Sequence, residues 1–283
     1  MRKQDVRTHF DQLATQRDMW RLRNRIYHAS IEQLCAGIIP AGRRVLELGC
    51  ATGDLLAAMH PSFGLGLDLS GEMVRLAHRK YPQIHFVQGD VESLPLLAAF
   101  DYILFSDVIG HLDDIWQALR ALHRVADAHS RLVITYYNFV WEGLLRLAEK
   151  LGLKMPEHHH NWLGMQDIHS LLNLADWQIE RSGMAVLLPV NVPGFTGWVN
   201  RVLASRGPFS WFSLVQYVVA RPAPQPEQRS LSVSVIVPCR NEVDNVSGAV
   251  ERTPDMGTHT EIIFVDGAST DGTVQRIEQL VAR

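Results

Sequence analysis

The chain has few cysteines and no long hydrophobic run. Cys35, Cys50 and Cys239 are the 3 cysteines among its 283 residues, and they are too far apart to form a metal-type spacing. This usage favours a reducing compartment and argues against a disulfide framework. No apolar run reaches the roughly 18 residues of a membrane-spanning helix, and residues 1–10 are too polar for a signal peptide. We therefore expect a cytoplasmic protein without a membrane-spanning segment.

A strong net charge is also missing. The formal net charge is -3, which argues against a large nucleic-acid footprint, although a local basic patch is compatible with it. The hydrophobic content of 47% and the charged content of 20% are ordinary for a soluble globular protein. The length permits one large domain or two of modest size. Nothing in the sequence indicates an oligomeric state.

Two common nucleotide-binding motifs are absent as well. The sequence contains no G-x-x-x-x-G-K-S/T loop and no G-x-G-x-x-G fingerprint. Instead, Gly49, Ala51 and Gly53 follow a short apolar run at 45–48 and precede an amphipathic pattern. This order predicts a strand, a tight turn and a helix, which is where doubly wound proteins bind nucleotides. The two glycines would let the backbone approach a ligand, and the amides at the helix start would face a carboxylate or phosphate.

Strand and helix patterns alternate along most of the chain. The periodicity predicts a helix over 3–38, broken before the first strand by Pro40 and Gly42. Residues 1–221 then read as an α/β domain: a doubly wound, Rossmann-like, mostly parallel sheet with helices on both faces and an antiparallel last strand. The helix at 70–80 has Ser70 as its expected N-cap. The later predicted strands are 63–68, 84–88, 100–106, 131–137, 177–189 and 212–220, and the other predicted helices are 113–126, 140–151, 165–175 and 199–204.

An acidic residue ends the second predicted strand, and another follows the third. Asp68 lies 19 residues after Gly49 at the carboxyl edge of the sheet, where a carboxylate can accept hydrogen bonds from both hydroxyls of a ribose. Asp90 follows the third strand, where an acidic side chain can accept from an adenine amino group while a neighbouring amide binds a ring nitrogen. The alternative for Asp68 is a helix-capping or solvated carboxylate, and for Asp90 an ordinary turn residue.

Residues 10–221 resemble the class I S-adenosylmethionine-dependent methyltransferases, whose first motif is E/D-x-G-x-G-x-G. Here that motif runs from Glu47 to Gly53, and Ala51 replaces its middle glycine. The resemblance implies a seven-stranded sheet, S-adenosyl-L-methionine as cofactor, and methyl transfer. It also implies the cofactor-binding residues, which are Glu47, Gly49, Cys50, Ala51 and Gly53 around the methionine part, Asp68 with Leu69 at the ribose, and Asp90 with Val91 at the adenine.

The segment at 100–112 holds the candidate catalytic residues. In the family that the chain resembles, this segment borders the methyl-acceptor pocket. Methyl transfer needs the acceptor held in line with the sulfonium methyl, and it needs a base only if the acceptor must lose a proton. His111 is the candidate base, and the alternative is a histidine that packs or hydrogen-bonds locally. Asp107 would orient the acceptor or stabilise the adenosyl edge.

Two further segments allow more than one interpretation. Trp20 and Tyr27 lie in a stretch with several arginines, which is either a packing helix with a solvated basic face or a cap near the substrate mouth. Residues 158–160 are three histidines, followed by Asn161 and Trp162. Adjacent loop residues point in different directions and no second ligand set is visible, so we expect no metal site. A substrate-facing lid and a solvated loop both remain open for this run.

The region after 221 has a different organisation. Prolines at 222, 224 and 226 predict a semi-rigid linker over 222–230. Residues 231–283 contain V-S-V-I-V-P-C-R-N-E and then E-I-I-F-V-D-G-A-S-T-D-G-T, and they resemble the opening of the family 2 glycosyltransferases. Ala268 stands where that family usually has glycine. The resemblance implies that Pro238, Asn241, Glu242 and Asp266 contact the nucleoside of a sugar-nucleotide donor.

The D-x-D metal motif of that family does not follow in this chain. We therefore expect a methyltransferase–glycosyltransferase fusion whose second module is truncated and transfers no sugar. Two βα units are marginal as an independent fold, so 231–283 should be packed less well than the rest and expose apolar sheet surface.

The methyl acceptor is not identified by the sequence. A small molecule and a glycan- or lipid-linked acceptor are both compatible with it, and the fusion associates the acceptor with cell-surface glycan or glycolipid assembly. One competing hypothesis is a non-catalytic cofactor-binding scaffold for a glycosyltransferase. Another is a nicotinamide-dependent oxidoreductase, which the missing fingerprint and Asp90 disfavour.

Overall fold

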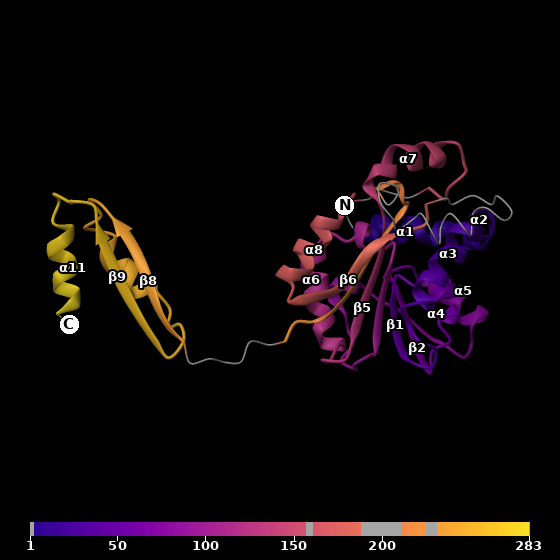
Figure 1. Cartoon of the computed structure of the whole chain (residues 1–283), viewed down its shortest axis with the longest axis horizontal. Helices are drawn as coiled ribbons and strands as arrows, with labels where there is room; N and C mark the ends of the chain where they lie inside the picture. The colour runs from indigo at the N-terminus through magenta and orange to yellow at the C-terminus, as the bar shows by residue number, and fades with distance from the viewer. Residues whose placement is uncertain (1–2, 157–160, 188–210, 225–230, 283) are drawn as a thin grey trace. The chain divides into compact units, whose positions relative to one another are not determined.

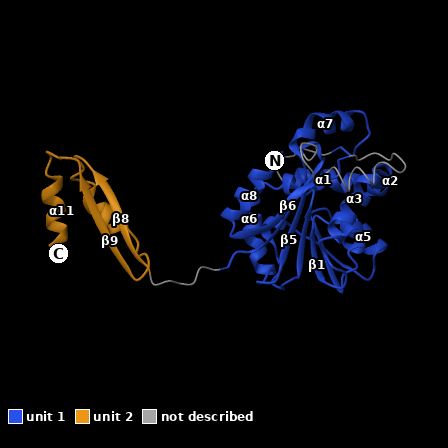
Figure 2. Ribbon diagram, viewed as in Figure 1, with its two compact units in different colours: residues 1–224 blue, residues 225–283 orange. Residues whose placement is uncertain are grey.

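The structure, a computed structural model, describes residues 3–156, 161–187, 211–224 and 231–282. The chain divides into two compact units, Met1–Pro224 and Gln225–Arg283 (Figure 2). This division falls inside the predicted linker at 222–230, and the last strand of the first unit continues through Pro222. Within the described residues, no helix is long and apolar enough to cross a membrane.

The first unit is built on a seven-stranded sheet with the order β3-β2-β1-β4-β5-β7-β6 (Figure 1). Strands β1 to β5 are parallel, and β7 runs antiparallel to both of its neighbours, β5 and β6. This confirms the predicted fold class. The strands are β1 (Arg44–Leu48), β2 (Phe63–Asp68), β3 (His85–Gln88), β4 (Tyr102–Ser106), β5 (Arg131–Tyr137), β6 (Trp177–Ala185) and β7 (Val215–Pro222).

Helices cover both faces of this sheet because alternate side chains of the central strands are apolar on both faces. Leu46 and Leu48 of β1 pack in one core with α6 and α8, whereas Val45 packs in a second core with α3, α4 and α5. The helices are α1 (Lys3–Leu13), α2 (Arg17–Arg23), α3 (Arg25–Ala36), α4 (Asp54–Ala58), α5 (Gly71–Lys80), α6 (Ile115–Ala121), α7 (Glu142–Lys150) and α8 (Met165–Leu174), with 3-10 turns at Ala14–Gln16, Val91–Ser93, Ile109–His111, Leu122–Val125 and Phe139–Trp141.

The predicted helix over 3–38 is wrong as a single element. It is divided into α1, α2 and α3 by the 3-10 turn at Ala14–Gln16 and by Asn24, whose backbone (φ -102°, ψ 31°) leaves the helical region. The predicted helix at 113–126 is likewise shorter, with Asp114 as N-cap and a 3-10 turn as its end. Ser70 is the N-cap of α5 as predicted, since its hydroxyl accepts from the Met73 amide.

The edge strands also differ from their predicted bounds. Strand β6 ends at Ala185 rather than at 189, because Val186 has a positive φ of 60° that a strand cannot continue through. Strand β7 begins at Val215, three residues later than predicted. The predicted helix at 199–204 and the histidines at 158–160 lie outside the described residues.

The second unit contains two parallel strands, β8 (Ser232–Cys239) and β9 (His259–Asp266), with helices α10 (Val246–Arg252) and α11 (Thr273–Val281). Both strands alternate between exposed and half-buried residues, so one sheet face is uncovered. Ile236 and Val265 on that face are 65% and 52% exposed. Among the described residues of this unit only Val246 and Thr273 are buried. The predicted loose packing and exposed apolar surface are therefore confirmed.

Candidate cofactor and acceptor site

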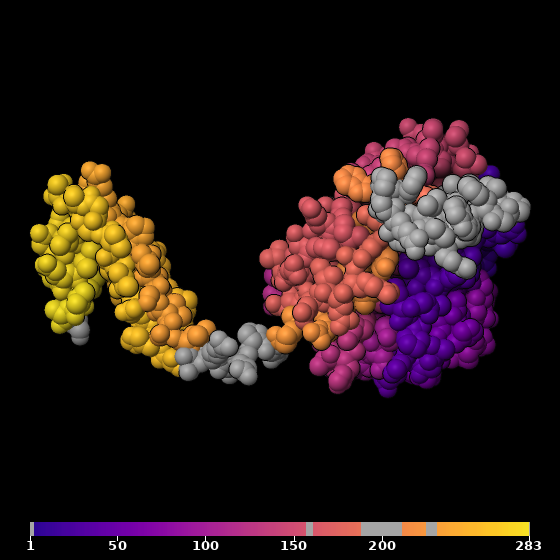
Figure 3. All heavy atoms as spheres, viewed as in Figure 1, coloured from indigo at the N-terminus to yellow at the C-terminus, as the bar shows by residue number. Residues whose placement is uncertain are grey.

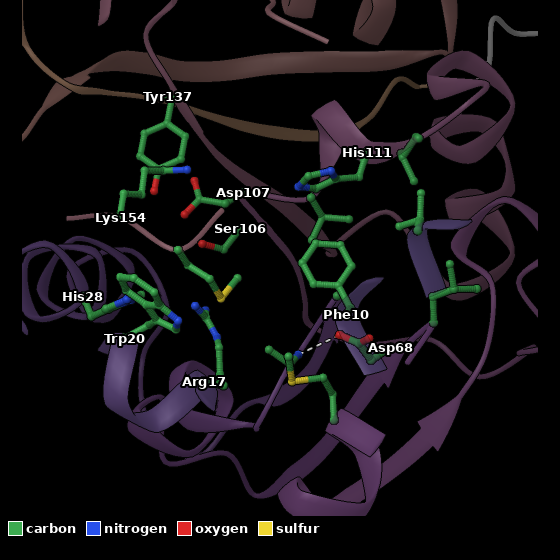
Figure 4. Close-up of a pocket in the computed structure, with 18 of the residues that line it drawn as sticks. Phe10, Arg17, Trp20, His28, Asp68, Ser106, Asp107, His111, Tyr137 and Lys154 are labelled. Atoms are coloured by element: carbon green, nitrogen blue, oxygen red, sulfur yellow. Dashed lines mark hydrogen bonds between the residues drawn. The ribbon is translucent and has the colours of Figure 1, made fainter. Parts of the chain in front are cut away.

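A cavity of about 370 Å³ lies where the carboxyl ends of β1, β2 and β4 meet the helices α1 to α3 and α7 (Figure 4). Eight of the residues predicted to bind cofactor or catalyse line it together, although they come from four separate segments. Those eight are Gly49, Ala51, Asp68, Leu69, Asp90, Val91, Asp107 and His111. Trp20 and Tyr27 line the same cavity, which favours the cap interpretation of the N-terminal helices over simple packing.

The glycines of the turn after β1 are required by protein packing as well as by backbone conformation. Gly49 has a φ of 72°, and a Cβ on it would lie 2.0 Å from Cγ2 of Val108. Gly53 has a φ of 79°, and its Cβ would lie 2.5 Å from the Phe86 ring. The expectation that these glycines serve mainly the approach of a ligand is therefore incomplete, because neighbouring side chains already occupy the space that each missing Cβ leaves.

The amides of this turn are engaged inside the protein. Those of Gly49 and Cys50 donate to the Leu67 carbonyl at 2.7 and 3.1 Å, and that of Gly53 donates to the Cys50 carbonyl at 2.8 Å. The Ala51 amide donates to Oδ2 of Asp68 at 2.8 Å. At the start of α4, the Leu56 amide donates to Glu47. These five amides therefore have acceptors within the protein, which reduces the number of turn and helix-start amides that could face an anion.

Two of the predicted cofactor-binding side chains lie beneath the turn rather than in the main cavity. Glu47 alternates with Leu46 and Leu48, so it faces the layer of α3, α4 and α5, where its Oε2 accepts from the Leu56 amide at 3.0 Å. Burial raises the pKa of Glu47 well above its usual range. Cys50 is also buried, and burial raises the pKa of its thiol. Both side chains support the turn from below.

Asp68 lines the cavity with a carboxylate that the backbone holds in place. Its Oδ1 accepts from the Ser70 amide and its Oδ2 from the Ala51 amide, each at 2.8 Å, so the carboxylate is fixed in orientation. Each oxygen keeps a second lone pair for a ligand hydroxyl. Burial raises the pKa of Asp68, and the two backbone amides oppose that shift.

Asp90 lines the same cavity and pairs there with Lys3 of α1. Its Oδ1 accepts from the Glu92 amide at 2.9 Å, and its Oδ2 accepts from Nζ of Lys3 at 2.5 Å. Lys3 also pairs with Oε2 of Glu92 at 2.9 Å. A ligand amino group that reached Asp90 would therefore meet a carboxylate already held by a cation from α1.

The candidate catalytic residues occupy different parts of the cavity. Asp107 has a positive φ of 58°, and its Oδ2 accepts from the Tyr27 hydroxyl at 2.5 Å. Tyr27 stacks on Tyr137, with ring centroids 5.3 Å apart, and burial raises its pKa well above the usual value. His111 lies beside Phe10, with centroids 5.4 Å apart. Figure 4 shows His111 on the opposite side of Asp107 from Trp20 and His28.

The second unit has a cavity of its own, lined by Pro238, Glu242 and Asp266. The fourth predicted nucleotide contact, Asn241, instead joins two loops: its amide donates to Oγ of Ser269 at 2.8 Å, and its Oδ1 accepts from the Thr270 amide at 2.9 Å. Hydrogen bonds from the hydroxyl and amide of Ser269 hold the pKa of Asp266 below its usual range. Asn241 therefore has a structural position, whereas the other three share a concave surface.

Models of known families match part of each unit. Residues 45–128 match the family model described as a methyltransferase domain, and residues 234–283 match glycosyl transferase family 2. The match to residues 45–128 supports the predicted resemblance of the first unit to the methyltransferases. The match to residues 234–283 likewise confirms the resemblance of the second unit to a family 2 glycosyltransferase.

Curated relatives of the methyltransferase domain match part of their length. A demethylmenaquinone methyltransferase from Chlorobaculum tepidum is 34% identical over 86 residues, which are 29% of this chain and 36% of the relative. A malonyl-[acyl-carrier protein] O-methyltransferase from Pseudescherichia vulneris is 34% identical over 107 residues, which are 35% of this chain and 43% of that protein. The chain thus spans less than half the length of these two relatives.

Solved structures share the fold of the methyltransferase domain. A possible histamine N-methyltransferase from Thermotoga maritima superposes with a TM-score of 0.61 at 17% identity, covering 77% of this chain and 99% of that one. The magnesium protoporphyrin IX methyltransferase of Synechocystis, solved with bound S-adenosylhomocysteine, gives a TM-score of 0.51 at 19% identity and covers 77% and 98%. At these identities the likeness concerns the fold of the first unit.

The cavity of the methyltransferase domain also contains polar residues that the sequence interpretation missed. Arg17, His28 and Lys154 line it, and the first two come from the cap helices α2 and α3. Burial, followed by the nearby charges of Arg17 and Arg21, lowers the pKa of His28 to about 3, so this imidazole is neutral. The three- and four-residue steps between positions 17, 20, 24 and 28 were the available signal for Arg17 and His28. No comparable signal pointed to Lys154.

Proposed function

We propose that the chain transfers the methyl group of S-adenosyl-L-methionine to an acceptor with an apolar part. The observation that carries this proposal is a single cavity in which Asp68 and Asp90 lie at one side and an apolar chamber at another. Asp68 would hold the ribose, Asp90 with the Val91 amide the adenine, and the turn at Gly49 the methionine part. The bound cofactor supplies an electrophilic methyl group, and the chain has to orient an acceptor beside it.

The apolar chamber is formed by α7 and the residues after it. Its walls include Leu145 and Ala148 on the inner side of α7, Leu153 and Met155 beyond it, and Leu214 before β7. Such a lining favours an acceptor that buries hydrocarbon, since buried apolar area contributes about 25 cal/mol per Å². The named relatives differ in their acceptors and do not indicate which kind this chain uses. The apolar lining of the chamber is what supports an apolar acceptor.

Two residues of the cavity can act on the acceptor. Asp107 is oriented by the Tyr27 hydroxyl and can position a polar group of the acceptor. His111 can accept a proton if the acceptor atom must lose one. The position of His111 next to Phe10 of the cap, rather than next to Asp107, makes the two roles separable by substitution.

The apolar chamber is tested by filling it. Ala148→Trp should abolish transfer of labelled methyl groups from S-adenosyl-L-methionine into an organic-solvent extract of cells, while S-adenosylhomocysteine still binds. Leu147→Trp is the matched control, because Leu147 lies on the same helix, is 50% exposed and does not line the cavity. Label that entered only water-soluble acceptors would contradict the apolar-acceptor proposal. Cofactor binding with no transfer to either extract would favour the scaffold hypothesis instead.

We also propose that the second unit binds the nucleoside part of a sugar nucleotide at Pro238, Glu242 and Asp266. The shared cavity of these residues and their match to the family 2 motif support it. Its association with the methyltransferase domain supports an acceptor in glycan or glycolipid assembly. Titration of UDP and GDP into the wild type and into Asp266→Asn tests the binding. Equal affinities for the two proteins would contradict the assignment.

A further inference from the structure

The helix α2 places two nitrogen-bearing side chains in the cofactor cavity. Arg17 and Trp20 are three residues apart, a spacing that puts them on the same face of a helix. Both line the cavity, and Figure 4 shows them pointing into one part of it, below Ser106 and Asp107. Arg17 also lines a smaller recess under the glycine turn, together with Gly49. These two side chains therefore lie at the end of the cavity that the turn borders.

Neither donor is used within the part of the chain that the structure describes. The Arg17 side chain makes no hydrogen bond or ion pair there, whereas that of Arg21 on the same helix pairs with Glu32 and with Asp54. The indole Nε1 of Trp20 is buried and likewise has no described acceptor. A buried N–H without an acceptor costs about 1–3 kcal/mol, so this position favours a ligand that supplies one.

The surrounding charges show which ligand group needs these donors. The amides of Gly49, Cys50, Ala51 and Gly53 in the nearby turn already have acceptors, and the Asp68 carboxylate is one of those acceptors. A second carboxylate entering this region would be repelled unless a cation accompanied it. The positive charge of Arg17 already acts on Glu47 and Asp68, opposing the upward shift of their pKa values.

We propose that Arg17 and the Trp20 indole form the subsite for the carboxylate at the amino-acid end of S-adenosyl-L-methionine. A guanidinium binds a carboxylate through two parallel hydrogen bonds, and the indole N–H supplies a third donor. The same amino-acid end carries an ammonium group, for which Asp107 is a complementary charge in the same cavity. This subsite rests on the proposed cofactor-binding role of the cavity.

Two ligands that differ in the amino-acid end test the subsite by binding alone. S-adenosylhomocysteine has the carboxylate, whereas 5′-methylthioadenosine keeps the nucleoside and thioether but lacks it. We expect Arg17→Met to weaken the binding of S-adenosylhomocysteine about tenfold to a hundredfold. The affinity for 5′-methylthioadenosine should change by no more than about twofold. Trp20→Phe should weaken the binding of S-adenosylhomocysteine by a smaller factor and leave that of 5′-methylthioadenosine unchanged. Arg17→Lys should retain part of the wild-type affinity for S-adenosylhomocysteine. Arg25→Met, an exposed change of the same type on α3, should alter neither.

Each other outcome overturns the subsite. Unchanged binding of S-adenosylhomocysteine to Arg17→Met would show that the cofactor carboxylate is bound elsewhere, and an effect of Arg17 on acceptor turnover alone would assign it to an acceptor carboxylate. Equal weakening of both ligands would show that Arg17 acts by supporting the cap. If the wild type bound both ligands equally well, the subsite would be wrong but the cofactor assignment would stand. If it bound neither ligand, the subsite and the cofactor assignment would both be wrong.

Discussion

At the scale of single residues, the turn after β1 depends on contacts that a ligand does not make. A methyl group on Gly49 would lie 2.0 Å from Val108, and the φ of 72° is unfavourable for alanine. Gly49→Ala should therefore lower the free energy of unfolding by about 2–4 kcal/mol, measured by urea denaturation. Gly143→Ala is the control, since a Cβ there meets nothing within 4 Å and should be neutral or slightly stabilising. Adding Val108→Ala to Gly49→Ala should restore part of the lost stability. If the two substitutions changed the free energy of unfolding additively, the proposed clash would be contradicted.

The neutral His28 predicts a pH dependence with a definite sign. Its folded-state pKa is about 3, below the unfolded value of 6.5. Between these values the unfolded chain binds a proton that the folded chain does not, so this group removes stability as the pH falls below 6.5.

We expect the free energy of unfolding of the wild type to fall more steeply than that of His28→Gln between pH 6.5 and 5. The difference in slope should be about 1 kcal/mol per pH unit. Urea melts at several pH values measure both slopes. Parallel slopes would show that His28 is protonated in the folded state as readily as in the unfolded one.

The positions of the acidic site residues could be predicted from the sequence, whereas the cap residues could not. Asp68 ends one strand and Asp90 follows another, so their place at the sheet edge results from the strand pattern. Glu47 matched the motif, but the alternation of side chains along β1 directs it to the layer below the turn. Arg17 reaches the cavity only because α2 folds back over the sheet, and a one-dimensional pattern does not contain that long-range packing.

At the scale of elements, the N-terminal helices form a cap that polar contacts hold to the sheet domain. Oδ1 of Asp11 accepts from Oγ of Ser70 at 2.6 Å and from the Glu72 amide at 3.1 Å, at the N-terminus of α5. Nζ of Lys80 pairs with Asp18 on α2 at 2.7 Å. These contacts join α1 and α2 to α5, the helix that follows β2 and Asp68, so we expect the position of the cap and cofactor binding to be linked.

Asp11→Ala should loosen this cap. Loss of the two hydrogen bonds should lower the free energy of unfolding by about 1–2 kcal/mol. It should also increase amide hydrogen exchange over residues 3–23 and weaken the binding of S-adenosylhomocysteine. Asp5→Ala, an exposed change in the same helix, is the control and should change neither exchange nor binding. Unchanged exchange in Asp11→Ala would show that other contacts hold the cap.

The order and type of the sheet elements were predictable, and their ends less so. Mostly apolar runs identified β1, β4 and β5 as strands. The break at Asn24 and the end of β6 at Val186 depend on local backbone angles that the residue types do not require.

At the scale of the whole molecule, the two units differ in how much of their chain is buried. The strands β1, β4 and β5 each contain fully buried residues, whereas the described strands of the second unit contain none. Amide hydrogen exchange should therefore be faster in β8 and β9 than in β1 and β4. Equal protection in the two units would contradict the loose packing of 231–282.

The central claim is that the first unit binds S-adenosyl-L-methionine through Asp68. Calorimetric titration of S-adenosylhomocysteine into the full chain, beside NAD, tests it most directly, with Asp68→Ala as the variant. Asp101→Ala is the matched control, because Asp101 also accepts a backbone hydrogen bond, from the Arg44 amide at 2.9 Å, but does not line the cavity. We predict binding of S-adenosylhomocysteine and not of NAD, at least about tenfold weaker in Asp68→Ala and unchanged in Asp101→Ala. Binding of NAD without S-adenosylhomocysteine, or equal affinity in wild type and Asp68→Ala, would contradict it.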